Sequence, residues 1–118
     1  MEEHKLDITL AHIGINASTP EESLRIARFF ARAFNLPLKA GNSSNFAGSI
    51  IEVMKQPYLG THGHIALASS DPEAAMEILR TRGLEFDLET AKYKDGKLTA
   101  IYLKEEFGGF AVHLLRRS

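Results

Sequence analysis

The chain has 118 residues, of which 44% are hydrophobic and 25% charged, and its net charge is −1. This length suits one domain with an ordinary core, so we expect residues 1–118 to fold as a single domain. The near-neutral charge excludes the bulk attraction to nucleic acid or anionic lipid that basic proteins show. No apolar run reaches the roughly 20 residues that span a bilayer, and the charged residues 1–5 are unlike a signal peptide. We therefore expect a cytoplasmic protein without nucleic-acid or membrane partners.

The chain contains an internal duplication. The segment HIGINASTPE, which begins at His12, returns without a gap as HIALASSDPE, which begins at His64. Each copy reads as an apolar strand, a small polar turn and a helix start, in which Thr19 or Asp71 is the N-cap and proline follows. Two copies are too few for a solenoid. The pattern predicts two related modules, at 8–55 and 63–115.

The first module is predicted to contain one helix and four strands. The opening strand spans 8–16, and the helix from about 20 to 34 packs its stripe of Leu24, Ala27, Phe30 and Phe34 on a sheet. Short strands follow at 38–40, around 45–47 and at 49–54, separated by turn residues.

The second module repeats this order after a short joint at 56–61. Its strand at 63–68 leads to a helix at 72–82 that ends at Gly83. Strands are predicted at 84–89, 98–104 and 110–115, and Asp95-Gly96 favours a hairpin between the first two of these. Only the first six or so residues and 116–118 look dispensable to the fold.

The fold class is therefore predicted as α+β. Two βαβββ modules, too small to fold separately, would share one cupped, eight-stranded mixed sheet with both helices outside.

Strand alternation places four ionisable side chains on the face opposite the helices. In the opening strands the branched residues must face the helices, which leaves His12 and His64 on the other face among glycine and alanine. The fourth strand of each module puts Glu52 and His113 on that same face. If the modules pair about a twofold axis, these four side chains converge.

Such a cluster suits a divalent metal. A buried carboxylate is costly unless it is paired or bound to metal, and the absence of cysteine leaves histidine and carboxylate as the ligands. Zinc, manganese, iron, nickel and cobalt all accept this donor set, and the sequence does not choose among them. The alternative is that the histidines are structural and that Glu52 forms a salt bridge with Lys55 or Arg80. His62 is either a substitute ligand or an ordinary loop residue.

Further polar residues are predicted to line the same cavity and bind substrate. Neutral hydrogen-bonding groups come from the turn after the first helix, and phenols and a cation come from later segments; the candidates are Asn42, Ser44, Tyr58, Lys92 and Tyr102. As an alternative, the asparagine and serine are ordinary turn residues and the tyrosines half-buried edge residues. No nucleophile motif, P-loop or dinucleotide-binding glycine pattern occurs.

The paired histidine-led strands and the positions of His12, Glu52 and His64 resemble the vicinal oxygen chelate superfamily over nearly the whole chain. That superfamily includes glyoxalase I, methylmalonyl-CoA epimerase, extradiol dioxygenases and bleomycin-resistance proteins. The resemblance implies a glyoxalase-like fold and metal ligands at His12, Glu52, His64 and His113. One departure is His113, because the family usually has glutamate there as ligand and proton-transfer base, so a glyoxalase I activity is in doubt.

A narrower resemblance concerns the runs GNSSNFAG from Gly41, PYLG from Pro57 and GGFAVH from Gly108. They resemble the small chelate-type domain associated with bacterial 2-keto-3-deoxy-6-phosphogluconate and 4-hydroxy-2-oxoglutarate aldolases. This implies a setting in sugar-acid metabolism and a keto-acid aldolase as partner, but it supplies no reaction.

These features lead to two functional hypotheses. The first is a metal-dependent lyase or isomerase acting on a small keto- or hydroxy-acid, in which Glu52 or His113 exchanges a proton. The second is a metal-free module that binds small molecules or assists an aldolase. We also expect a homodimer, because a cupped sheet in a small domain leaves edge strands and apolar surface to cover.

Overall fold

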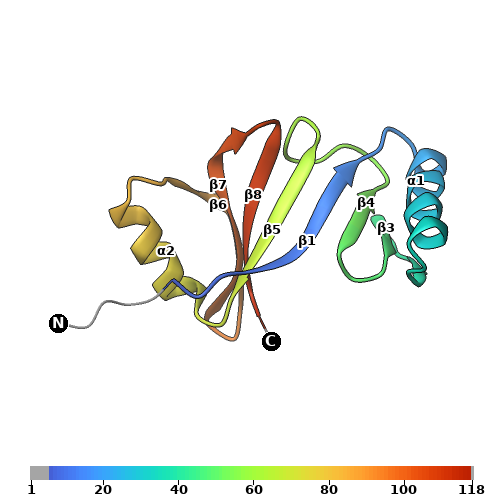
Figure 1. Cartoon of the computed structure of the whole chain (residues 1–118). Helices are drawn as coiled ribbons and strands as arrows, with labels where there is room; N and C mark the ends of the chain where they lie inside the picture. Colours follow the sequence, from blue (N-terminus) through green and yellow to red (C-terminus); the bar gives the residue numbers. More distant parts are fainter. Residues whose placement is uncertain (1–5, 118) are drawn as a thin grey trace.

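A computed structural model describes residues 6–117. Its first half contains β1 (Thr9–Asn16), α1 (Pro20–Ala33), β2 (Leu38–Ala40), β3 (Ser44–Ala47) and β4 (Ile51–Met54). Its second half contains β5 (Gly63–Ser69), α2 (Pro72–Thr81), β6 (Phe86–Lys94), β7 (Lys97–Phe107) and β8 (Phe110–Arg116). The strands form one sheet in the order β2-β3-β4-β1-β5-β8-β7-β6, with the helices toward its two ends (Figure 1). The predicted α+β fold with two βαβββ units is confirmed.

The register between β1 and β5 reveals the twofold relation of the two units. These strands pair antiparallel, with Ile13 opposite Ile65, His12 opposite Ala66 and Gly14 opposite His64. Ile13 and Ile65 are equivalent residues of the sequence repeat, so the pairing is centred on an axis between them. On either side, β4 runs parallel to β1 and β8 runs parallel to β5. The predicted twofold rotation between the two opening strands is therefore confirmed.

Both helices begin at the predicted caps. The Thr19 hydroxyl accepts a hydrogen bond from the amide of Glu22 at 3.1 Å, and the Asp71 carboxylate accepts one from the amide of Ala74 at 3.1 Å. A proline follows each cap. These side chains satisfy amides that a helix leaves without partners in its first turn.

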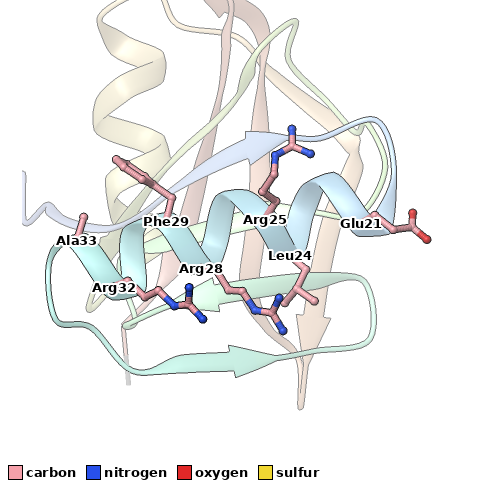
Figure 2. Close-up of a pocket in the computed structure, with 7 residues that line it drawn as sticks. All are labelled: Glu21, Leu24, Arg25, Arg28, Phe29, Arg32 and Ala33. Carbon is pink, nitrogen blue, oxygen red and sulfur yellow. The ribbon is translucent and has the colours of Figure 1, made fainter.

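The buried face of α1 differs from the predicted stripe. The helix buries Ser23 and Ala27, whereas Phe34 is its C-cap and remains 62% exposed. Ser23 donates a hydrogen bond to the carbonyl of Val53 at 2.7 Å, which a hydrophobicity pattern could not reveal. The helix also carries exposed side chains, those of Phe29 and of Arg25, Arg28 and Arg32 (Figure 2).

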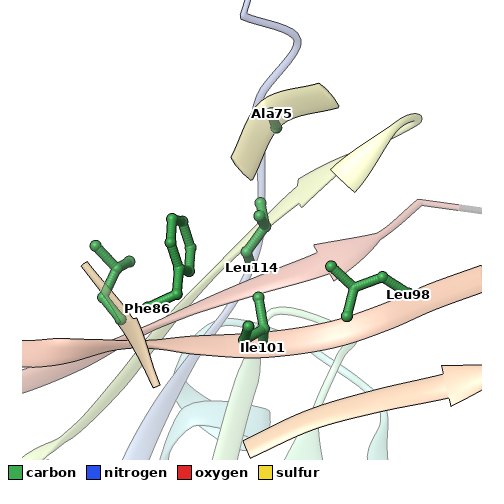
Figure 3. Close-up of a cluster of buried hydrophobic side chains, with 6 residues drawn as sticks. Ala75, Phe86, Leu98, Ile101 and Leu114 are labelled. Carbon is green, nitrogen blue, oxygen red and sulfur yellow. The ribbon is translucent and has the colours of Figure 1, made fainter. Parts of the chain in front are cut away.

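Two apolar cores lie between the helices and the sheet. The core under α2 is formed by Ala75, Phe86, Leu98, Ile101, Leu103 and Leu114 (Figure 3). The smaller core under α1 is formed by Ala17, Ala27 and Val53. Because both cores lie on the helix side, the other face of the sheet is available for polar groups.

The strands of the second unit are longer than predicted. β6 continues to Lys94 instead of ending near residue 89, and β7 extends from Lys97 to Phe107. Asp95 and Gly96, both with positive φ, close the predicted hairpin between them. As a result Lys92 lies within a strand and not in a loop.

The C-terminal residues Arg116 and Arg117, predicted to be dispensable to the fold, take part in ion pairs and hydrogen bonds. Arg116 pairs with Glu73 at the start of α2 and donates to the carbonyl of Leu98. Arg117 pairs with Asp7 at 2.6 Å, which ties the end of β8 to the segment before β1. Of the other residues considered dispensable, Leu6 packs against the core under α2, and 1–5 and 118 lie outside the described part of the chain.

The Asp7–Arg117 pair predicts a pH-dependent stability. Hydrogen bonds from Ser70 and then Arg117 hold the pKa of Asp7 below its ordinary value of 3.8. A pKa lowered by folding stabilises the fold fully above that ordinary value, and the contribution is lost progressively as the pH falls from that value through the lowered pKa of the folded state. Arg117→Ala should therefore lower the thermal midpoint at pH 7, and its difference from wild type should shrink below about pH 4. Arg28→Ala on α1 is the matched control, and a difference independent of pH would contradict this account.

Candidate metal centre

Three of the four predicted ligands meet on the face of the sheet opposite the helices. Nε2 of His12 lies 3.1 Å from Oε1 of Glu52, and Nε2 of His64 lies 3.2 Å from the same oxygen. The two Nε2 atoms are 3.2 Å apart. β1, β4 and β5 each supply one side chain, and the three potential ligand atoms form a nearly equilateral triangle.

The triangle has the size that a metal requires. Ligands about 2.1 Å from a common ion are separated by about 3.0 Å at right angles and by about 3.4 Å at tetrahedral angles. The three observed separations fall between these values. Two imidazoles and one carboxylate are also a donor set that zinc, iron and manganese accept. The residues therefore fit a divalent ion that all three bind from one side. The remaining coordination positions of the ion would stay open.

Hydrogen bonds keep the carboxyl group of Glu52 ionised, which suits it to binding a cation. Burial raises the pKa of this carboxyl, but hydrogen bonds from His12, His64 and Ser44 outweigh burial and leave the pKa well below its usual range. The Ser44 hydroxyl donates to Oε2 at 2.7 Å, so one carboxylate oxygen is fixed by serine while the other faces the histidines. Glu52 is thus an anion at neutral pH, and it does not form the alternative salt bridge with Lys55 or Arg80.

Gly14 makes room for this arrangement. It lies beside Glu52 in one neighbouring strand and beside His64 in the other. A Cβ at Gly14 would lie 2.0 Å from Cε1 of His64, well inside van der Waals contact. The imidazole of His64, which is 3% exposed, therefore lies over the glycine and reaches toward Glu52.

His113 lies beside the triangle and not in it. Glu52 pairs with Gly14, and His113 pairs with Ala66. Because Gly14 and Ala66 are equivalent in the sequence repeat, Glu52 and His113 occupy equivalent positions in the two units. The His113 ring stacks on Tyr102, with centroids 4.0 Å apart and an interplanar angle of 4°, and its centroid is 6.1 Å from that of His64. Burial and then the charges of the other histidines and Lys92 lower the pKa of His113 to about 4. The ring is therefore neutral at pH 7.

Two buried ring nitrogens near the triangle have no hydrogen-bond partner within residues 6–117, Nδ1 of His64 and Nδ1 of His113. A buried polar atom without a partner costs free energy, so such atoms commonly meet a ligand or water.

The predicted substrate-binding residues lie at different distances from the triangle. Ser44 is bonded to Glu52, and Tyr102 packs between His113 and Tyr58, at centroid separations of 4.0 and 6.2 Å. Tyr58 is 53% exposed and lines a hollow of about 560 Å³ together with Asn42. Lys92 is exposed on β6, and its charge is among the causes that lower the pKa of His113.

Three positions near the site were not predicted as site residues. Phe46 places its ring 6.0 Å from that of His12, and Gly14 provides the space described above. Asn16 fixes the joint between the units by donating to the carbonyl of Gly60 at 2.9 Å. Asn16 ends the first strand just before a turn, and this is the signal that could have identified it. His62 packs near Phe110 and lies outside the cluster.

Comparison with known proteins shows the fold. No family model and no curated protein sequence matches the chain. A solved methylmalonyl-CoA epimerase superimposes with a TM-score of 0.65 at 15% identity, covering 98% of this chain and 99% of that one. The enzyme of the same name from Mycobacterium tuberculosis gives 0.61 at 16% identity, covering 100% and 93%. A mutant 4-hydroxymandelate synthase from Streptomyces coelicolor gives 0.56 at 16%, covering 95% of this chain and 49% of that one. The chain has the glyoxalase-like fold.

The contact at Gly14 gives a direct test of the site. In Gly14→Ala the new methyl group must displace the His64 ring, so zinc affinity should fall by about 10 to 100-fold, the range typical of groups that orient a ligand. Calorimetric titration with zinc measures the change, and far-ultraviolet circular dichroism checks that the sheet is retained. Zinc binding by the alanine variant with wild-type affinity would show that the ring does not need this space.

Proposed function

We propose that the chain is a metal-dependent lyase or isomerase of the vicinal oxygen chelate superfamily, acting on a small keto- or hydroxy-acid. The observation that carries this proposal is the triangle formed by His12, Glu52 and His64, whose dimensions and donor set suit a divalent ion. The glyoxalase-like fold supports it, because two solved structures that share this fold are methylmalonyl-CoA epimerases.

The three triangle residues would hold the ion. A bound divalent ion would act as a Lewis acid and stabilise negative charge that develops on substrate oxygens. Ser44 keeps Glu52 oriented toward the two imidazoles. Phe46 and Tyr102 stand at equivalent positions opposite Glu52 and His113, so they would enclose the substrate from both sides of the ion.

His113 is proposed as the group that exchanges the substrate proton. Its pKa of about 4 keeps the imidazole neutral at pH 7, and its Nδ1 has no hydrogen-bond partner within residues 6–117. A neutral imidazole has a lone pair free to accept a proton from carbon, and the low pKa of its conjugate acid favours the return of that proton over its removal. Glu52, held by three donors and facing the ion, is better suited to ligation than to proton exchange.

Two further features of the proposal concern partners and location. A homodimer would cover the exposed apolar side chains of Phe29, Phe34 and Ile50. Neither helix in residues 6–117 is long and apolar enough to cross a membrane. The cytoplasmic location and the aldolase partner remain predictions.

The second candidate is a metal-free binding module. It is favoured by one observation, that hydrogen bonds from His12, His64 and Ser44 already satisfy the Glu52 carboxylate. In that case the histidines would be structural and the face of the sheet would bind an uncharged or anionic ligand by itself.

Metal content and proton exchange together test the enzyme proposal. Protein purified without an affinity tag and supplemented with zinc, manganese, iron, cobalt or nickel should retain about one ion per chain. The loaded protein should exchange the proton next to the carbonyl of its substrate with deuterium from solvent, followed by nuclear magnetic resonance. The panel contains small keto- and hydroxy-acids and methylmalonyl-CoA, and Glu52→Gln is the control. Retention of no metal would favour the binding module, and stoichiometric metal without exchange would contradict the enzyme.

His113→Ala separates the two roles expected for His113. If His113 exchanges protons from its place in the Tyr102 stack, the alanine variant should keep zinc and manganese affinity within about threefold and lose deuterium exchange by about 100-fold or more, as for loss of a general base. If His113 is instead the fourth ligand, metal affinity should fall by more than the 10 to 100-fold typical of second-sphere losses. His113→Glu would then restore it. Titration of both variants with the two metals decides which role holds.

A further inference from the structure

A row of side chains runs across the first unit on the same face as the triangle. Lys39 of β2 lies opposite Phe46 of β3, and Phe46 lies opposite Glu52 of β4. Directly opposed residues of antiparallel strands point to the same face of a sheet. The Phe46 ring, 6.0 Å from that of His12, shows that this face is the one that carries the triangle. Lys39 therefore lies on the same face as the triangle, two strands away from Glu52.

The spacing places a cation at a defined distance from the triangle. Neighbouring strands are about 4.8 Å apart, so Lys39 and Glu52 are separated by about 10 Å of sheet. A hollow of about 300 Å³ next to Phe46 is lined by Lys39, Ala40, Gly41, Phe46, Gly48 and Ser49. Among the ion pairs within residues 6–117, none involves Lys39. The lysine is thus a free cation at the edge of a hollow that has room for part of a small ligand.

We propose that Lys39 binds an anionic group, a carboxylate or a phosphate, at the end of the substrate remote from its metal-bound oxygens. Phe46 would pack against the carbon chain between the two ends. This inference rests on the proposed function and narrows its substrate class to acids that carry a second anionic group. An ammonium group paired with an anion forms a charge-assisted hydrogen bond, which is stronger than a neutral one.

The second unit carries a different residue at the position equivalent to Lys39, and this difference favours one orientation of the substrate. Its residues equivalent to Lys39 and Phe46 are Asp87 and Tyr102, because Asp87 lies opposite Tyr102 and Tyr102 opposite His113. An aspartate at the equivalent place repels an anion, so the anionic end is directed to the first unit. Lys92 stands on the second wall as well, and it is the competing anchor that the experiment must separate from Lys39.

Two matched pairs of acids test the proposal by calorimetry on manganese-loaded protein. Pyruvate and 2-oxoglutarate share a keto-acid group and differ in a second carboxylate, and glycerate and 3-phosphoglycerate differ in a phosphate. At least one doubly anionic acid should bind about tenfold more tightly than its partner, as expected for one charge-assisted hydrogen bond. Lys39→Ala should abolish this preference without changing the affinity for pyruvate or glycerate, and Lys39→Arg should keep most of it. Lys97→Ala, in the distant β6–β7 hairpin, is the control.

The preferred partner identifies the anion as carboxylate or phosphate. Equal binding of both acids in each pair by metal-loaded wild type would overturn the anion site and leave the metal site standing. A preference that survives Lys39→Ala but is lost in Lys92→Ala would overturn it in favour of the opposite wall. Metal content is measured on the same samples, and a wild type that retains no manganese would overturn the proposed function and this site together.

Discussion

The antiparallel register of β1 and β5 is the constraint on which the candidate site depends. With Ile13 opposite Ile65, each histidine lies one position from the axis, and both imidazoles emerge on the face away from the helices. A slip of one residue would move every side chain of one strand to the other face and separate the histidines. The branched residues that must be buried against the helix side therefore fix the register, and through it they fix the distance between His12 and His64.

The carboxylate of Glu52 converts this geometry into a site for a cation. Burial of an anion opposes folding, and here three donors compensate for it. The two imidazole Nε2 atoms are 3.2 Å apart, and each lies within hydrogen-bonding distance of the same Glu52 oxygen. A divalent ion bound there would take the Nε2 lone pairs, so each neutral ring would carry its proton on Nδ1 instead.

The sequence was sufficient to predict what depends on periodicity and on the repeat. The helix caps, the faces of the strands and the equivalence of Glu52 and His113 all follow from it. It could not predict features that depend on single close contacts. The triangle forms beside Glu52 because Gly14 leaves room for the His64 ring, whereas the equivalent residue of the second unit is Ala66, whose methyl group occupies the corresponding place. The exposure of Phe34 likewise depends on where the helix ends.

The duplication produces a symmetric arrangement of strands. Different side chains at equivalent positions of the two units make the candidate site chemically asymmetric. Gly14 and Ala66, Glu52 and His113, Phe46 and Tyr102, and Lys39 and Asp87 form pairs of equivalent positions across the axis. In two of these pairs, Glu52 with His113 and Lys39 with Asp87, the first unit carries the residue suited to binding a cation or an anion, and the second unit carries a neutral or repelling one. A symmetric cup would accept a substrate in two orientations. Under the proposed function, these differences favour a single orientation, in which the reacting carbon faces the neutral imidazole of His113.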